Sequence, residues 1–247
     1  MIRCDLNCDL GEGMGNDAAI IPYITSANIA CGYHAGDETT MRETVILAKD
    51  AGVAIGAHPS FLDKENFGRT EIEDVKPGQV YELVMAQLDI LQEIVFGCNA
   101  RLYHVKPHGA LYNMAAKNAS LANAIAKAVH DFDKSLVLFG LSGSHLISEA
   151  NAVGLKTASE VFADRTYQND GNLTPRGLPN ALIEDEQQSL QQVLQMIRNR
   201  EVTATSGKKI SIVAETVCLH GDGKKAVEIA KAIHQRLKAE GIKVMSL

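Results

Sequence analysis

Acidic, basic and imidazole side chains recur just after short apolar segments of this chain. Asp9 and Glu12 follow the first such segment, and Lys106 and His108 follow a later one. Groups of these types transfer protons, stabilise developing negative charge or bind a first-row divalent metal ion. The residues at or just past the apolar segments are Asp9, Glu12, Asn28, His34, Asp37, His58, Ser60, Lys106, His108, Glu160, Asp164, Arg165, His220 and Asp222.

A metal site would have to be assembled from separate parts of the chain. The sequence contains no H-E-x-x-H and no paired C-x-x-C, the patterns in which neighbouring residues bind zinc. If a metal ion is bound, we expect its ligands among Asp9, His34, His58 and His108. The alternative is that these histidines hydrogen-bond the substrate or nearby carboxylates, and the sequence leaves both open.

Alternation along the first apolar segment places Asp5, Asn7 and Asp9 on one face of a strand. We expect Asp5 and His104 to form a buried structural pair. Asp9, Lys106 and His108 are the better candidates for catalysis, because a buried ammonium group needs a carboxylate or an anionic ligand beside it.

Other motifs are weaker. Gly11–Gly15 is not G-x-G-x-x-G, and no Walker motif is present.

The turn 220–223 precedes an expected helix, so it could bind an anion or could only provide Asp222 as the N-cap. Gly140–Ser144 ends in Ser where the esterase motif G-x-S-x-G requires Gly. The long segment Ala163–Ile183 is either a lid whose Arg165 or Arg176 binds an anion, or a solvated loop.

These residues must be positioned by an alternation of strands and helices. The expected strands are Arg3–Leu10, Ala27–Cys31, Val53–Ala57, Leu102–Pro107, Leu136–Leu141, Leu155–Val161 and Lys209–Leu219. The expected helices are Glu38–Ala51, Gln79–Phe96, Leu121–Asp131, Ser144–Val153, Asp185–Asn199 and Lys224–Glu240.

Strands with one entirely polar face fit the inside of a barrel, near the mouth where the following loops converge, better than an open sheet covered on both sides. We therefore expect an α/β fold, a distorted (β/α) barrel of about seven parallel strands. The 247 residues fit one domain, 1–247.

Composition excludes some functions. The formal net charge of −6 is spread along the chain, which argues against nucleic-acid binding. Apolar runs are too short for a membrane span. The five cysteines are odd in number and fit reduced core thiols, so we expect a cytoplasmic protein.

Several blocks of the sequence, in chain order, resemble the LamB/YcsF family. They are DLNCDLGEGMGND (Asp5–Asp17), SANIACGYHAGD (Ser26–Asp37), IGAHPSF (Ile55–Phe61), NFGR (Asn66–Arg69), VKPHGALYN (Val105–Asn113), EVFADRTYQNDGNLTPR (Glu160–Arg176) and CLHGD (Cys218–Asp222). The resemblance implies a barrel similar to those of glycoside hydrolases and deacetylases. It also implies ATP-driven opening of the lactam 5-oxo-L-proline to L-glutamate, ADP and phosphate, together with 5-oxoprolinase subunits of the B and C types.

For that reaction we assign catalytic roles to Asp9, Lys106, His108 and His58. Asp9 or His108 would activate water, and Lys106 and His58 would stabilise negative charge. Substrate binding is assigned to Asn28, His34, Glu12, Glu160, Arg165, His220 and Asp222. ATP, with Mg²⁺, is the expected cofactor. The alternatives are a metal-dependent amide hydrolase or deacetylase that does not use ATP, and a subunit that only binds the substrate.

Overall fold

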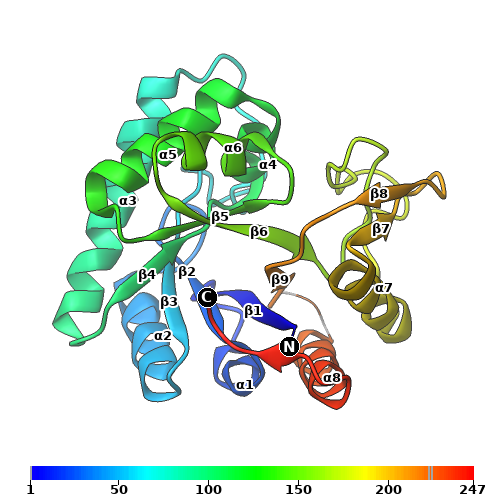
Figure 1. The fold of residues 1–247 in the computed structure, drawn as a ribbon. Helices are drawn as coiled ribbons and strands as arrows, with labels where there is room; N and C mark the ends of the chain where they lie inside the picture. The colour runs from blue at the N-terminus through cyan, green and yellow to red at the C-terminus, as the bar shows by residue number, and fades with distance from the viewer. Residues whose placement is uncertain (1, 222, 224) are drawn as a thin grey trace.

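The structure is a computed structural model that describes residues 2–221, 223 and 225–247. Among these residues, parallel strands close into a barrel because β1 pairs with β2 on one side and with β9 on the other (Figure 1). In barrel order the strands are β1 (Arg3–Leu10), β2 (Ser26–Ala30), β3 (Ala54–His58), β4 (Leu102–Val105), β5 (Val137–Leu141), β6 (Lys156–Phe162) and β9 (Thr216–Leu219). The predicted (β/α) barrel is confirmed.

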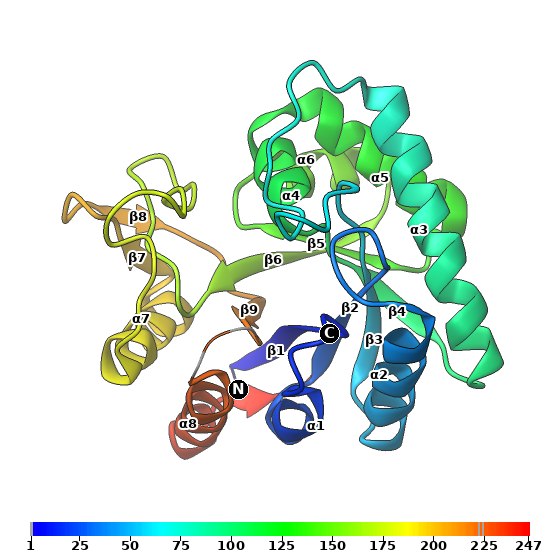
Figure 2. The ribbon, with the colours of Figure 1, turned by 180° about the vertical axis from the view of Figure 1, so that it is seen from behind.

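Helices cover the outside of the barrel (Figure 2). They are α1 (Asp17–Ile20), the 3₁₀ turn η1 (Ile21–Tyr23), α2 (Glu38–Asp50), α3 (Pro77–Gly97), α4 (Gly109–Lys117), α5 (Ala119–Asp133), α6 (His145–Ala152), α7 (Glu186–Asn199) and α8 (Ala226–Ala239). The side chain of Asp37 accepts the N–H of Thr40 and so caps α2, and Asp185 caps α7 by accepting from Gln188. An acceptor at this position satisfies an N–H group that the first helical turn leaves without a partner.

The prediction of one strand over Lys209–Leu219 was wrong. Within this range, β8 (Lys209–Ser211) pairs antiparallel with β7 (Glu201–Thr203), and the barrel strand β9 starts only at Thr216. A last strand, β10 (Lys243–Val244), pairs with the first residues of β1. The predicted helix from Lys224 starts in the structure at Ala226, and Lys224 itself lies outside the described residues.

The segment from residue 163 to residue 215 forms a lobe beside the barrel, made of a long loop, α7 and the β7–β8 hairpin (Figure 1). Arg165 is buried in it and donates to the carbonyl oxygens of Ala181, at 3.3 Å, and Thr174, at 2.6 Å. The hydroxyl of Tyr167, also buried, accepts the N–H of Phe162 at 2.8 Å. The long loop is therefore tied together by buried polar contacts.

Deep inside the barrel lies a group of side chains that we call the floor layer: Asp5, Thr25, Ser26, His104 and Thr216. The carboxylate of Asp5 accepts hydrogen bonds from the hydroxyls of Thr25, Ser26 and Thr216. Burial raises the pKa of Asp5, although these hydrogen bonds act to lower it.

The expected pair between Asp5 and His104 is wrong, because His104 bonds elsewhere. Its Nε2 lies 2.8 Å from Oδ1 of Asn28, and its ring stacks on Phe139 with centroids 4.3 Å apart. Burial lowers the pKa of His104 to about 3. The ring crosses β3 at Gly56, where a Cβ atom would lie 2.0 Å from Nε2 of His104. Only glycine leaves room for the imidazole here.

The cysteines are all free thiols, as expected, and Cys4, Cys8, Cys31 and Cys218 are buried whereas Cys98 is partly exposed. Burial raises the pKa of Cys31 to about 12 and also raises the pKa values of the other buried thiols. In the part of the chain that the structure describes, no helix is both long and apolar enough to cross a membrane.

Candidate active site

A pocket of about 270 Å³ opens at the end of the barrel where the strands end. Its wall is formed from strand ends, from the start of α4 and from the long loop of the lobe. The charged and titratable residues that line it are Asp9, His58, Arg69, Glu71, Lys106, His108, Tyr112, Lys117, Arg165, Arg176 and His220. We call Asp9, His58, Lys106, His108, Glu160 and His220 the mouth layer.

Lys106 is the central cation of the mouth layer and is almost fully buried. Its Nζ lies 2.8 Å from Oδ1 of Asp9, 3.1 Å from Oε1 of Glu160, 3.2 Å from Oδ1 of Asn7 and 3.0 Å from Sγ of Cys218. An ammonium group has three protons, so these neighbours already engage them all. Burial alone would lower the pKa of Lys106, but Asp9, Cys218 and Glu160 raise it well above its usual value.

Asp9 is ionised by its surroundings. Burial acts to raise its pKa, but His58 and Lys106 outweigh burial and hold the pKa well below its usual range. Nδ2 of Asn28 also donates to Oδ1 of Asp9 at 2.9 Å. A carboxylate this strongly stabilised is a weak base, which argues against Asp9 as the group that deprotonates water.

His58 and His108 form a linked pair of rings. Nδ1 of His58 lies 2.7 Å from the carbonyl oxygen of Lys106, and Nε2 of His108 lies 2.9 Å from the carbonyl oxygen of Phe67. A carbonyl oxygen can only accept, so both of these outer nitrogens carry protons. The inner nitrogens, Nε2 of His58 and Nδ1 of His108, face each other at 2.9 Å, and a proton or a metal ion must lie between them.

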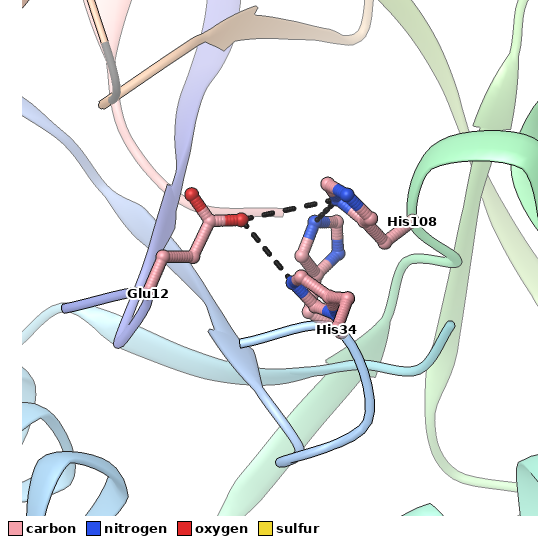
Figure 3. Close-up of side chains that lie close together, drawn as sticks. Glu12, His34 and His108 are labelled. Carbon is pink, nitrogen blue, oxygen red and sulfur yellow. Dashed lines mark hydrogen bonds and ion pairs between the residues drawn. The ribbon is translucent and has the colours of Figure 1, made fainter. Parts of the chain in front are cut away.

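His34 and Glu12 lie next to this pair. Figure 3 shows the Glu12 carboxylate directed at the rings of His34 and His108. Its Oε1 is 3.3 Å from Nε2 of His34 and 3.8 Å from Nδ1 of His108. Nδ1 of His34 lies 2.8 Å from Oγ of Ser60. Burial lowers the pKa of His34 to about 3, so this imidazole is neutral at pH 7.

The loop after β3 covers these imidazoles. The ring of Phe67 packs edge-on against both His34 and His108. At Gly68, where φ is +65°, an added Cβ would lie 2.9 Å from Cβ of His34 and 3.1 Å from Cδ2 of His108. The Gly68 carbonyl oxygen accepts the N–H of Ala110 at 2.9 Å. The Asn66–Arg69 block therefore acts as a close-fitting cover.

His220 has the geometry of an oriented base. Both carboxylate oxygens of Asp164 lie near its Nδ1, at 2.9 and 2.7 Å, so this nitrogen donates, and in the neutral imidazole the lone pair is on Nε2. A ring nitrogen of His220, a carboxylate oxygen of Asp9 and Sγ of Cys218 lie within 4.8 Å of one another. His220 lines the pocket, so a water bound there can reach it. Burial acts to raise the pKa of Asp164, but His220, Arg176 and Arg165 together lower it.

Glu12, His34, His58 and His108 could also hold a metal ion, because one donor atom from each lies within 4.8 Å of the others. A carboxylate with imidazoles suits zinc or another first-row ion. However, the rings of His34 and His108 are stacked at 3.9 Å with an interplanar angle of 7°. One ion cannot lie in both ring planes. With the side chains in these positions, the ligands would therefore be Glu12, His58 and one of the two stacked imidazoles.

The structure brings most of the predicted site residues together. Asp9, His58, Lys106, His108, Arg165 and His220 line the pocket. Asn28, Glu160, Glu12 and His34 lie behind this wall as contacts of its residues. Asp222 lies outside the described residues.

Sequence reasoning missed Tyr112, Arg69 and the role of Asp164. The hydroxyl of Tyr112 donates to Oε2 of Glu160 at 2.7 Å, and Tyr112 lines the pocket. It belongs to α4, a helix that was not predicted. Arg69 also lines the pocket, and its guanidinium lies over the ring of Phe67 at 4.8 Å.

The barrel is of the class found in carbohydrate esterases and deacetylases. A family 4 carbohydrate esterase from Streptomyces lividans superposes with a TM-score of 0.51 at 13% identity, covering 98% of this chain and 91% of that one. The T48 deacetylase superposes with a TM-score of 0.55 at 12% identity, covering 99% and 88%. At such low sequence identity, the similarity shows a shared fold and nothing about function.

Relatives of higher identity define the family. The LamB/YcsF family model matches residues 4–247, and the chain belongs to this family. The chain is 56% identical to the A-type subunit of 5-oxoprolinase from Geobacillus kaustophilus over all of this chain and 97% of that protein. It is 53% identical to the same-named protein of Staphylococcus carnosus over 100% and 99%. A solved lactam utilization protein from Thermus thermophilus superposes with a TM-score of 0.91 at 38% identity, over the full length of both chains.

Proposed function

We propose that this chain is the lactam-binding and ring-opening subunit of an ATP-dependent 5-oxoprolinase, working with partner subunits of the B and C types. One observation carries this: the pocket joins an oriented base, His220 with Asp164, to a wall of cations. The full-length relatives named as A-type subunits of 5-oxoprolinase support the same substrate. The pocket volume of about 270 Å³ is large enough for a ring of 5-oxoproline size.

The substrate carries a carboxylate that must be recognised in the pocket. Arg69 and Arg176 line its wall, and both present planar, permanently charged groups that can bind a carboxylate through two parallel hydrogen bonds. Arg165 is less suited, because its guanidinium already binds the carbonyl oxygens of Thr174 and Ala181. We assign the substrate carboxylate to Arg176.

An unstrained lactam is a poor electrophile, and ATP changes this. Transfer of the γ-phosphoryl group to the lactam oxygen breaks the bond between that group and ADP, and leaves an activated carbon. Water then adds to this carbon, and the ring nitrogen leaves as the carbon–nitrogen bond breaks, which gives glutamate as its acyl phosphate. A second water releases phosphate and L-glutamate. Two waters and one ATP are thus consumed per ring.

Within this sequence of steps, His220 is our choice for the base that deprotonates the attacking water. His220 lines the pocket and is held through its Nδ1 by Asp164, whereas both nitrogens of His108 are engaged. Lys106 acts by its positive charge and by holding Asp9 and Glu160, and the imidazoles of His58 and His108 stabilise negative charge as polar groups of the pocket wall. Asp9 positions these groups.

The test is glutamate release from 5-oxoproline by the purified chain, alone and with its partner subunits, with and without Mg·ATP. We expect release only with ATP and partners, and a loss of about 100-fold or more in kcat for Asp9→Asn and His108→Ala. Asp131→Asn, at an exposed carboxylate on α5, is the matched control. Near-normal glutamate formation by correctly folded Asp9→Asn or His108→Ala would show that these roles are wrong.

The convergence of Glu12, His34, His58 and His108 favours one second candidate, a metal-dependent amide hydrolase that does not use ATP. Metal analysis of the purified chain, with the same assay, separates the two. Stoichiometric zinc with ATP-independent turnover would support the hydrolase. Tight binding of 5-oxoproline, with undiminished activity of the complex after conservative changes at Asp9, Lys106 and His108, would instead indicate a subunit that only binds.

A further inference from the structure

The turn between β5 and α6 contains a buried hydroxyl group without a partner. Ser144 is 9% exposed, and within the described part of the chain its Oγ has no hydrogen-bond partner. A buried hydroxyl that makes no hydrogen bond costs about 1–3 kcal/mol, so such a group needs a reason. Ser144 is also the N-cap of α6, yet its side chain does not cap the helix.

The same turn presents backbone donors. His145 and Leu146 are the first residues of α6, whose N–H groups have no acceptor within the helix. They stand where the helix dipole is positive, a position that favours anions. Gly143, with φ of +77°, has nothing within 4 Å of an ideal Cβ, so the turn is open to a ligand on that side.

Gly143, Ser144 and His145 border a depression of about 510 Å³. It is separate from the reaction pocket but shares Lys117, Leu141 and Asn172 with it. Lys117 supplies a positive charge on this shared wall. Asp170 stands in the same depression, where its carboxylate accepts hydrogen bonds from N–H and Nδ2 of Asn172. A carboxylate here favours an anion that arrives with Mg²⁺, as nucleotide phosphates do.

We propose that the Ser142–Leu146 turn is a phosphate subsite that binds the phosphate chain of Mg·ATP beside the reaction pocket. Ser144 Oγ and the N–H group of His145 donate to phosphate oxygens, and Lys117 neutralises charge. The choice of nucleotide rests on the proposed function, whereas the binding of a phosphate group does not. The segment Gly140–Ser144, which fails as an esterase motif because Ser144 stands where that motif requires Gly, thereby acquires a use: Ser144 binds an anion.

Equilibrium binding to the full chain, by calorimetry, tests the subsite with three probes: a non-hydrolysable ATP analogue, ADP and inorganic phosphate, each with and without Mg²⁺. We expect saturable binding, tightest for the ATP analogue with Mg²⁺. Ser144→Ala should weaken it roughly 10-fold or more, the loss of one hydrogen bond to a charged group. Ser148→Ala, on the same helix and in the same depression, should leave it unchanged.

Ser144→Asp separates binding from folding. Aspartate is a good N-cap, so the variant should keep or raise the unfolding temperature, while its charge should repel phosphate and abolish binding. Unchanged affinity of Ser144→Asp, or no saturable binding of any probe to the chain both alone and with its partners, would overturn the subsite. If phosphate binds but glutamate release needs no ATP, the proposed function fails and the subsite stands. If release needs ATP and Ser144→Asp leaves it unaltered, the subsite fails alone.

Discussion

The floor layer and the mouth layer of the barrel are both polar and both buried, but their polar groups have different bonding partners. In the floor layer, hydroxyls meet both oxygens of the Asp5 carboxylate, and His104 bonds to an amide. In the mouth layer, Lys106 holds two carboxylates, and His220, held by Asp164 through Nδ1, lines the pocket. Buried polarity alone therefore does not mark a catalytic site.

The difference predicts opposite responses to mutation. A change in the floor layer should lower stability and leave the chemistry of the folded molecules unchanged, since no floor residue lines the pocket. A change in the mouth layer at the pocket wall should reduce catalysis and leave stability nearly unchanged, provided that no buried charge loses its partner.

The largest effect is expected at His220. His220→Asn should lower kcat for ATP-dependent glutamate release about 10²–10⁴-fold, the usual contribution of a general base. Asp164→Asn should lower kcat in the same direction, because His220 would lose the acceptor that orients it. Both variants should unfold close to the wild-type temperature. An unaltered kcat in either variant, measured with the partner subunits, would remove His220 from the mechanism.

A smaller effect, on stability alone, is expected at Gly56. Gly56→Ala would place a methyl group 2.0 Å from Nε2 of His104, and the ring must move. Overpacking of this kind typically lowers the free energy of unfolding by about 1–3 kcal/mol, measurable by urea denaturation. The specific activity of the folded fraction should stay within about two-fold of wild type. A large loss of activity at full stability would show that the floor layer acts in the chemistry.

Near neutral pH, the smallest effect is a pH dependence of stability. The pKa of His104 in the folded protein, about 3, lies below its ordinary value of 6.5. Between these two pH values the unfolded chain therefore binds a proton that the folded protein does not bind. Stability is therefore full above pH 6.5 and falls as pH drops from 6.5 towards 3, by about 1.4 kcal/mol per pH unit for one group. His104→Gln should unfold with a shallower dependence between pH 7 and pH 5.5. An equal slope in both proteins would contradict this.

Much of the barrel could be predicted from the sequence. The strand at Arg3–Leu10 was predicted with the bounds that β1 has, because its apolar and polar residues alternate strictly. Lys209–Leu219 failed since apolar residues continue through the whole range. Its division into a hairpin strand and a barrel strand depends on contacts outside it, such as the N–H of Val213 donating to Oγ of Ser142. The short helix α4 starts at Gly109, two residues after Pro107. Both are residues typical of a turn, and the helix was missed for that reason.

Part of the site could be predicted from the types of residue at the strand ends, because the C-terminal ends of parallel barrel strands lie together at one end of the barrel. The hydrogen-bonding partners did not follow from it. Asp5 was expected to need His104, yet hydroxyls of Thr25, Ser26 and Thr216 satisfy it. The choice of His220 over His108 likewise depends on which nitrogen is already engaged, and spacing along a chain does not encode that.

The distribution of thiols has a practical consequence. Cys98 follows α3 and precedes β4, which places it at the opposite end of the barrel from the pocket, and it is partly exposed. The other cysteines are buried and disfavour the thiolate form that alkylating reagents require. A fluorescent maleimide should therefore attach to the native chain at Cys98 alone. Such a dye would report assembly with partner subunits from a position remote from the chemistry.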